Sequence, residues 1–223
     1  PIKFVSTAAH SGASKGTSDW PLFRTAEVYL NYAEAKAELG TLTKDDLLIS
    51  IDRIRDRAGM KGLDMAAANA NPDPFLLACY PNVTKSENTG VILEIRRERT
   101  IELVMEGLRI WDMFRWKEGA QLVNETNPYY GIYFSGPGLY DMDGDGRNDL
   151  ELYVDKQTSS PADGLTVLRI GSDIILSDMA ENRGYVVAWS TLKYTWNEER
   201  DYLWPIPADQ RVLTGGLLTQ NPG

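Results

Sequence analysis

The sequence is poor in the residues on which much protein chemistry depends. Its 223 residues include one histidine, His10, and one cysteine, Cys79. A single cysteine excludes an intramolecular disulfide and any zinc cluster built from cysteines. A single histidine removes most histidine-dependent catalysis, and His10 lies in a Gly- and Ser-containing stretch that offers a base no fixed support.

Long apolar runs are also missing. No stretch of about 18 apolar residues occurs, so the sequence predicts no transmembrane helix. No charged segment followed by an apolar one marks a signal peptide at the start. The chain begins at Pro1 instead of a methionine, and we expect it to be part of a longer protein.

Positive charge is in deficit, with 23 Lys and Arg against 32 Asp and Glu and a net charge of −9. An acidic protein repels phosphate backbones, so we expect no nucleic-acid partner. Hydrophobic residues at 43% and charged residues at 25% are typical of a globular protein. The length allows one large domain or two small ones.

The first part of the chain has helical periodicity. In the predicted helix over residues 21–40, Ala26, Leu30, Ala33 and Ala37 lie on one face. Because alanines line this face, another helix is expected to pack very close. A capping box at Thr43 predicts a second helix that ends at Gly59. Together they predict an antiparallel helix pair close in length to a tetratricopeptide unit.

The pattern then changes twice. Residues 61–90 are predicted to be a polar connection, in which the Asn-Pro-Asp-Pro run at 71–74 breaks any helix. The pattern of residues 91–117 predicts one long helix. Its predicted apolar face consists of Ile101, Val104, Leu108 and Trp111. From residue 120 onward loops predominate, with short β-like runs at 150–154 and 166–170 and an extended tail at 202–207.

An acidic motif over residues 141–149 predicts a calcium site. It matches the first half of an EF-hand loop, in which carboxylates at positions 1, 3 and 5 converge and a glycine at position 6 permits a sharp turn. Position 12 is Leu152 instead of a bidentate glutamate, and the flanks look extended. We therefore predict a strand-flanked loop with a structural Ca²⁺; the alternative is an acidic turn that binds nothing. The predicted ligands are Asp141, Asp143, Asp145, Arg147 (through its carbonyl) and Asp149.

Four glutamates, Glu94, Glu98, Glu102 and Glu106, follow one another at i+4 spacing. Two functional interpretations are a di-metal site, which needs histidines that this region lacks, and a glycosidase acid pair. The structural interpretation is a helix carrying i+3 ion pairs. Those pairs are Glu94–Arg97, Arg99–Glu102, Glu106–Arg109 and Asp112–Arg115, with cross-helix partners available in Arg53, Arg55 and Arg57.

Aromatic residues gather on both sides of the acidic motif. They are Tyr129, Tyr130, Tyr133, Phe134 and Tyr140 before it, and Trp189, Tyr194, Trp196 and Trp204 after it. Exposed rings would offer platforms for sugars, whereas buried rings would form core. Both interpretations stay open at the level of sequence.

Four separated segments together resemble the C-terminal half of the SusD/RagB family. They occur in the family's order and spacing, and they are 21–35 (PLFRTAEVYLNYAEA), 54–59 (IRDRAG), 96–116 (RRERTIELVMEGLRIWDMFRW) and 203–223 (LWPIP to QNPG). The resemblance implies a mainly α-helical fold, a superhelix of tetratricopeptide-like antiparallel helix pairs with long irregular loops and a few short strands. The helical scaffold would lie mainly in residues 21–119 and the loop-rich region in 120–223.

The resemblance also implies a function. Members of the family are surface-exposed outer-membrane lipoproteins of Bacteroidetes that bind glycans or other nutrients. They deliver them to a SusC-type TonB-dependent transporter and are not enzymes. We accordingly expect this chain to belong to such a binder; the alternatives are a carboxylate-dependent glycoside hydrolase and a tetratricopeptide-type interaction scaffold.

The chain departs from the family in length, since members run to roughly twice its size or more. We therefore expect residues 1–223 to be the C-terminal portion of one such domain, with its N-terminal part absent. Membrane attachment would then depend on a lipid anchor outside this chain, because Cys79 lies in mid-chain. No ligand-binding residue is carried over by motif.

Overall fold

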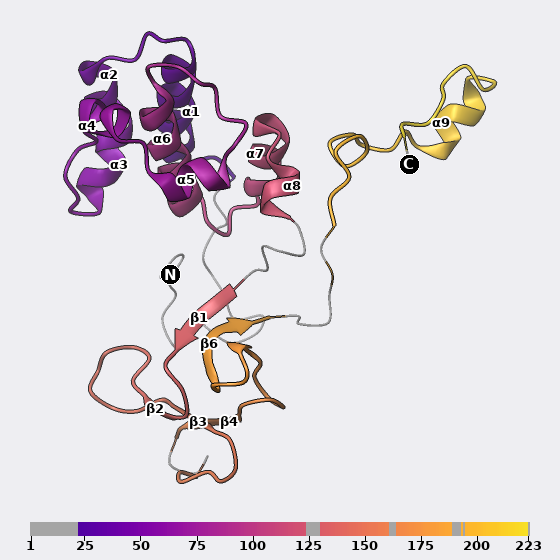
Figure 1. The fold of residues 1–223 in the computed structure, drawn as a ribbon. Coiled ribbons are helices and arrows are strands. Elements are labelled where there is room, and N and C mark those ends of the chain that lie inside the picture. Colours follow the sequence, from indigo (N-terminus) through magenta and orange to yellow (C-terminus); the bar gives the residue numbers. More distant parts are fainter. Residues whose placement is uncertain (1–21, 124–129, 161–163, 189–192, 194, 223) are drawn as a thin grey trace. The chain divides into compact units, whose positions relative to one another are not determined.

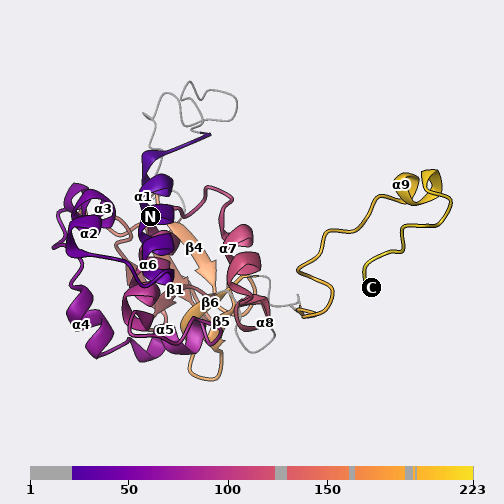
Figure 2. The same cartoon turned by 90° about the horizontal axis from the view of Figure 1, so that it is seen from above.

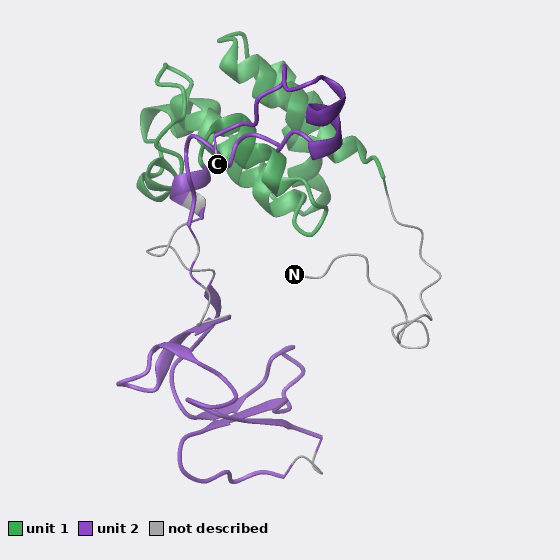
Figure 3. Cartoon of the chain, turned by 90° about the vertical axis from the view of Figure 1, so that its right-hand side faces the viewer, with its two compact units in different colours: residues 1–118 green, residues 119–223 purple. Residues whose placement is uncertain are grey.

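The computed structural model describes residues 22–123, 130–160, 164–188, 193 and 195–222 (Figure 1). Among these residues helices predominate over a few short strands, so the predicted mainly α-helical class is confirmed. The chain divides into two compact units, residues 1–118 and 119–223 (Figure 3). The predictions for residues 1–20, including His10, and for Tyr129, Trp189 and Tyr194 lie outside the described residues.

The first helix pair opens the helical unit. It consists of α1 (Thr25–Glu38), α2 (Lys44–Ile49) and α3 (Ile51–Arg57). The predicted small-residue face of α1 is buried, with Ala33 at 0% and Ala37 at 1% exposure. This face lets α6 (Thr89–Glu102) approach closely, and the two helices lie side by side in Figures 1 and 2.

The second predicted helix begins as expected but is broken. The Thr43 hydroxyl accepts a hydrogen bond from the Asp46 amide at 3.2 Å, and the Asp46 carboxylate accepts from the Thr43 amide at 2.9 Å, so the capping box is confirmed. Ser50, with φ −124° and ψ −98°, then separates α2 from α3. The Ser50 hydroxyl donates to the Asp46 carbonyl, which compensates part of the lost helical hydrogen bonding.

The prediction of a helix-free connection over 61–90 is wrong, because α4 (Met65–Ala70) and α5 (Pro74–Cys79) lie there. The Asp64 carboxylate caps α4 by accepting from the Ala67 amide at 3.0 Å. The Asp73 carboxylate caps α5, and Pro74 occupies its first turn, where a missing N–H costs nothing. The run at 71–74 therefore ends one helix and begins the next.

The single long helix predicted over 91–117 is also wrong. It is divided into α6 and α7 (Arg109–Trp116), and Met105 (φ 64°) and Gly107 (φ 76°) turn the chain between them. A short α8 (Gly119–Leu122) follows. The predicted apolar face spanned this break and is largely exposed, with Ile101 at 64% and Trp111 at 50%. The buried face of α6 lies nearer its start, at Val91, Ile92, Leu93 and Ile95.

The second unit contains two small sheets. The first has the order β1-β6-β5 and consists of β1 (Tyr130–Phe134), β6 (Arg183–Val187) and β5 (Leu176–Asp178). The second has the order β2-β3-β4 and consists of β2 (Gly138–Tyr140), β3 (Leu150–Tyr153) and β4 (Thr166–Arg169). The strands predicted near 150–154 and 166–170 are thus confirmed. The buried core of these sheets is Phe134, Leu150, Leu152, Ile170 and Leu176.

The C-terminal tail is irregular through 204–207 and then forms α9 (Ala208–Leu213). The Gln220 side chain closes it, accepting from the Ile206 amide at 2.9 Å and donating to the Ile206 carbonyl at 3.0 Å. Over the described part of the chain, every helix is too short or too polar to cross a bilayer.

Candidate functional site

The acidic motif forms the loop of a β-hairpin. Tyr140 ends β2 and Leu150 begins β3, so the predicted strand flanks are present. The Asp149 amide donates to the Tyr140 carbonyl at 2.9 Å and closes the loop at its base. The antiparallel pairing of β2 with β3 therefore holds both ends of the loop together.

The loop is shaped by its own carboxylates. The two oxygens of Asp141 accept from the amides of Gly144 at 2.6 Å and Gly146 at 2.8 Å, and Asp149 accepts from the Met142 amide at 2.8 Å. Both glycines have positive φ, 83° and 87°, which a side chain would strain. The amide hydrogen bonds hold the pKa of the Asp141 carboxyl below its ordinary value, so the loop keeps this carboxylate charged.

Three of the predicted ligands come together. Asp141, Asp143 and Asp149 each offer one carboxylate oxygen, and these oxygens lie within 4.8 Å of one another. Asp145 is outside this group, and its carboxylate accepts from the Arg147 amide at 2.8 Å. Clustered carboxylate oxygens on a mostly exposed loop fit the hard-oxygen coordination of Ca²⁺. Ligation of Ca²⁺ by these three residues, by Asp145 and by the Arg147 carbonyl stays a prediction.

Glu151 lies one residue before the position of the EF-hand glutamate, but its carboxylate is bound elsewhere. It is 3% exposed and binds the segment after β3 instead, where it accepts from the Thr158 amide at 2.6 Å, the Thr158 hydroxyl at 2.7 Å and the Ser159 amide at 2.6 Å. These hydrogen bonds lower its pKa to about 2. Leu152, at the position of the EF-hand glutamate, is buried in the core.

The glutamates of the i+4 series are held in ion pairs, as the structural interpretation predicted. Arg24 lies 2.9 Å from a carboxylate oxygen of Glu102 and 2.7 Å from one of Glu106. Arg57 lies 2.6 Å from the second oxygen of Glu102. Arg24, just before α1, and Arg57 of α3 thus neutralise the C-terminal end of α6 and the turn after it.

Glu94 and Glu98 are paired as well. Glu94 forms the predicted i+3 pair with Arg97 at 3.4 Å, and Glu98 pairs with the predicted cross-helix partner Arg55 at 2.9 Å. Burial raises the pKa of Glu98, an effect that Arg55 opposes. Glu98 is only 8% exposed, so a substrate would not reach it.

Two other predicted i+3 pairs have different outcomes. Asp112 pairs with Arg115 at 3.2 Å as predicted. Arg99 pairs with Asp112 at 2.7 Å instead of with Glu102, so that prediction is wrong. Both residues lie in α6, but the turn after this helix brings Asp112 back onto Arg99, and Arg24 and Arg57 bind Glu102 instead.

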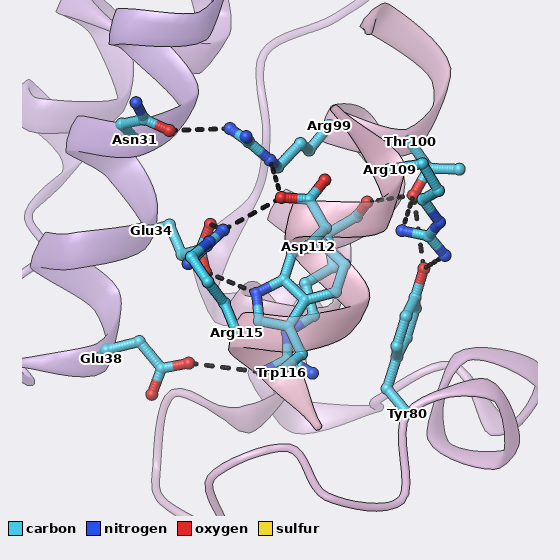
Figure 4. A network of polar contacts seen from close by, with 11 residues as sticks. Asn31, Glu34, Glu38, Tyr80, Arg99, Thr100, Arg109, Asp112, Arg115 and Trp116 are labelled. Carbon is cyan, nitrogen blue, oxygen red and sulfur yellow. Dashed lines mark hydrogen bonds and ion pairs between the residues drawn. The ribbon is translucent and has the colours of Figure 1, made fainter. Parts of the chain in front are cut away.

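A buried polar network that the sequence analysis missed joins α1, α6 and α7 (Figure 4). The two oxygens of Glu34 accept from Arg115 at 2.9 and 3.0 Å, and one also accepts from the Trp116 indole at 2.7 Å. Burial raises the pKa of Glu34, but the hydrogen bonds from Arg115 and Trp116 outweigh it and lower the net value. The sequence does carry one sign of this network: Glu34 lies beside the alanines on the buried face of α1. A carboxylate in such a position needs a buried partner.

Arg96 stacks beside this network. Its guanidinium carbon lies 5.5 Å from the centre of the Tyr80 ring and 4.6 Å from that of Trp116, within cation–π range. It also pairs with Glu118 at 3.5 Å and Glu38 at 3.6 Å. An open hollow of about 500 Å³ adjoins the network, but the charged groups of Glu34, Arg99 and Arg115 that line it already bind one another or their neighbours.

The aromatic residues divide between core and surface. Phe134 is buried and its ring centre lies 4.8 Å from that of Tyr140. Tyr130, Tyr133 and Tyr185 are instead exposed by 51%, 52% and 46%. The core interpretation is thus confirmed for Phe134, whereas sugar binding by the exposed rings stays a prediction.

Comparison with known proteins identifies the family. A model of the SusD family matches residues 1–223, and no curated protein matches the chain. A solved SusD-like protein from Bacteroides fragilis NCTC 9343 is similar, with 23% identity over 92% of this chain and a TM-score of 0.47. The chain covers only 26% of that protein. Because the family model matches from end to end, the chain belongs to the SusD/RagB family.

Proposed function

We propose that this chain is part of a cell-surface protein that binds a glycan or another nutrient and delivers it to a SusC-type TonB-dependent outer-membrane transporter. The observation that carries the proposal is the match to the SusD family over residues 1–223. In this proposal the helical unit is the scaffold, and the loops and strands of the second unit supply the surface that contacts the ligand.

The ion pairs favour binding over hydrolysis. A glycosidase needs two carboxyl groups that face the scissile bond, one of them free to give up a proton. The Glu94–Glu106 series instead pairs with arginines, and Glu98, whose pKa is raised, is buried. We therefore propose that the protein is not an enzyme and that these acids stabilise the helical scaffold.

The proposed location is the outer membrane, with the protein exposed at the cell surface and held by a lipid anchor outside this chain. Cys79 does not suit the anchor, because it lies in α5 and is partly buried. Burial raises the pKa of its thiol, so Cys79 is also a poor nucleophile. The net charge of −9 agrees with the absence of a nucleic acid among the proposed partners.

We propose further that the hairpin loop binds a structural Ca²⁺. Asp141, Asp143 and Asp149 supply the carboxylate group, with Asp145 and the carbonyl of Arg147 as additional predicted ligands. The ion would neutralise carboxylates that otherwise repel one another and would thereby stiffen the loop.

The function is tested with full-length protein in native gels that contain starch, xylan, β-glucan or galactomannan, followed by a reducing-end assay. We expect slowed migration in at least one gel, no new reducing ends, and co-purification with the transporter. New reducing ends would favour the hydrolase, and unretarded migration in every gel would favour the interaction scaffold.

A further inference from the structure

The outer face of the β1–β6 pair carries three tyrosines whose rings contact one another. The ring centres of Tyr130 and Tyr185 are 5.4 Å apart with an interplanar angle of 19°, so these rings are stacked. The ring of Tyr133 meets that of Tyr185 edge-on, at 5.1 Å and 71°. Tyr185 is thus the centre of a preformed aromatic group, which we call the tyrosine platform.

A bulge in β1 places Tyr130 and Tyr133 on the same side. Tyr130 pairs with Val187 and Tyr133 with Tyr185, so three residue steps in β1 span two steps in β6. In a regular strand, residues three apart point to opposite faces. The extra residue changes this alternation, and such bulges characteristically re-aim side chains beside binding sites.

The opposite face of the same strands supports the platform. Phe134 follows Tyr133 and is buried in the core, and Val186 follows Tyr185 and packs against that core. The two tyrosines that precede them therefore point outward. Since their backbones are fixed by buried neighbours, the rings are held in place before any ligand arrives, which lowers the entropic cost of binding.

The chemistry of the platform fits a sugar. Among the described residues, no hydrogen bond engages the hydroxyl of Tyr130, Tyr133 or Tyr185, so each keeps a donor and an acceptor for a ligand. Tyrosine combines a flat apolar face with a polar tip at low entropic cost. A pyranose has the matching character, because its C–H face is apolar and its rim carries hydroxyls.

Charge separates a sugar from the other common ligand of aromatic platforms, a nucleic-acid base. Binding of nucleic acid relies on cationic side chains that track the phosphates. The arginine of β6, Arg183, lies 3.5 Å from Asp178 in an ion pair, and the chain as a whole carries −9. The platform therefore suits an uncharged ligand.

We propose that Tyr130, Tyr133 and Tyr185 form a binding subsite for a neutral pyranose unit of a glycan. This inference rests on the proposed function and deepens it, since it names the surface and the sugar class. Tyr185 is the central contact because both other rings pack against it.

The test compares variants of the full-length protein in the polysaccharide gels described above. For the polysaccharide that retards the wild-type protein, we expect the Kd of Y133A/Y185A to be higher by about tenfold or more. Loss of a central aromatic contact of about 1.4 kcal/mol produces a change of this size. Y185F, which keeps the ring, is expected to retain most of the affinity. F75A is the matched control, because Phe75 is an exposed ring (70%) in the helical unit.

Each outcome decides between the two proposals. If the wild-type protein is retained and Y133A/Y185A is retained equally, the platform is not the subsite and serves another contact, whereas the proposed function stands. If the wild-type protein is retained by none of the four polysaccharides, the proposed glycan function fails and this inference with it. An unchanged melting temperature of the variants establishes that a lost affinity is not lost folding.

Discussion

The Nε atom of Arg99 lies 2.7 Å from a carboxylate oxygen of Asp112, and the two side chains are only 4% and 3% exposed. The pair joins α6 to α7 across the turn that separates them. Arg99 also donates to the Asn31 side chain at 2.7 Å, which ties the pair to α1. One buried arginine thus fixes the mutual positions of three helices.

Removing one partner of this pair should be costly. Asp112→Asn removes the carboxylate that lies 2.7 Å from the buried guanidinium of Arg99, and we expect a loss of about 3–5 kcal/mol in the free energy of unfolding. Urea titration measures it. The control is Asp178→Asn, which removes an exposed partner of Arg183 and should cost less than about 1 kcal/mol. Equal losses in both variants would contradict the assigned role.

Gly90 is expected to tolerate no side chain. A Cβ atom there would lie 1.9 Å from the Ala68 carbonyl oxygen, because the start of α6 crosses α4 at close range. Gly90→Ala should therefore destabilise the helical unit by about 1–3 kcal/mol through overpacking, although alanine normally favours helices. Thermal unfolding compares it with Glu87→Ala, an exposed neighbour that should change stability by about 0.5 kcal/mol or less. A stabilised G90A variant would refute the close crossing.

Glu151 should make the second unit sensitive to acid. Its pKa falls from an ordinary 4.5 to about 2 because backbone and hydroxyl groups of Thr158 and Ser159 donate to it. A carboxyl with a lowered pKa stabilises the folded state above its unfolded pKa and loses that contribution as pH falls. The stability difference between wild type and Glu151→Gln should then shrink from pH 4.5 toward about 2.

Hydrogen exchange of the Thr158 and Ser159 amides measures the same effect of pH at the two backbone groups that donate to Glu151. Glu181→Gln, a substitution at an exposed site, serves as the control and should leave the pH profile unaltered. A difference between wild type and Glu151→Gln that stays constant down to pH 2 would mean that Glu151 is not the acid-sensitive group.

Calcium should raise the melting temperature. If the loop binds the ion, a concentration of one hundred times Kd stabilises the protein by about 2.7 kcal/mol. EDTA should reverse the effect, and Asp141→Asn should abolish it, whereas Asp155→Asn, a change at an exposed site outside the loop, should not. Melts that are identical with and without EDTA, together with no metal in an elemental assay, would remove the calcium proposal.

Local patterns predicted the parts of this structure that depend on neighbouring residues. The capping box at Thr43, the buried alanines of α1 and the strands β3 and β4 follow from spacing within a few residues. Asp73 followed by Pro74 is also a local signal, of a cap and a first-turn proline. The proline alone predicts a break, whereas the proline together with the aspartate before it marks the start of a helix.

The remaining features depend on contacts that are distant in sequence. The break after α6 contains no proline, and Met105 takes a positive φ although its side chain disfavours it. Glu102 and Glu106 both bind Arg24, and Asp112 returns to Arg99. These tertiary ion pairs outweigh the local tendency of residues 91–117 to continue as one helix, and periodicity carries no information about them.

The long separation of these partners has a consequence for how the chain acquires its structure. Arg24 and Glu106 are 82 residues apart in sequence, and Glu34 and Trp116 are also 82 apart. At roughly 5–20 residues per second, the ribosome takes roughly 4–16 s to make the partners after α1 has emerged. During that interval the alanine face of α1 and the carboxylate of Glu34 lack the partners that α6 and α7 supply, so α1 is not expected to complete its packing before both helices have been made.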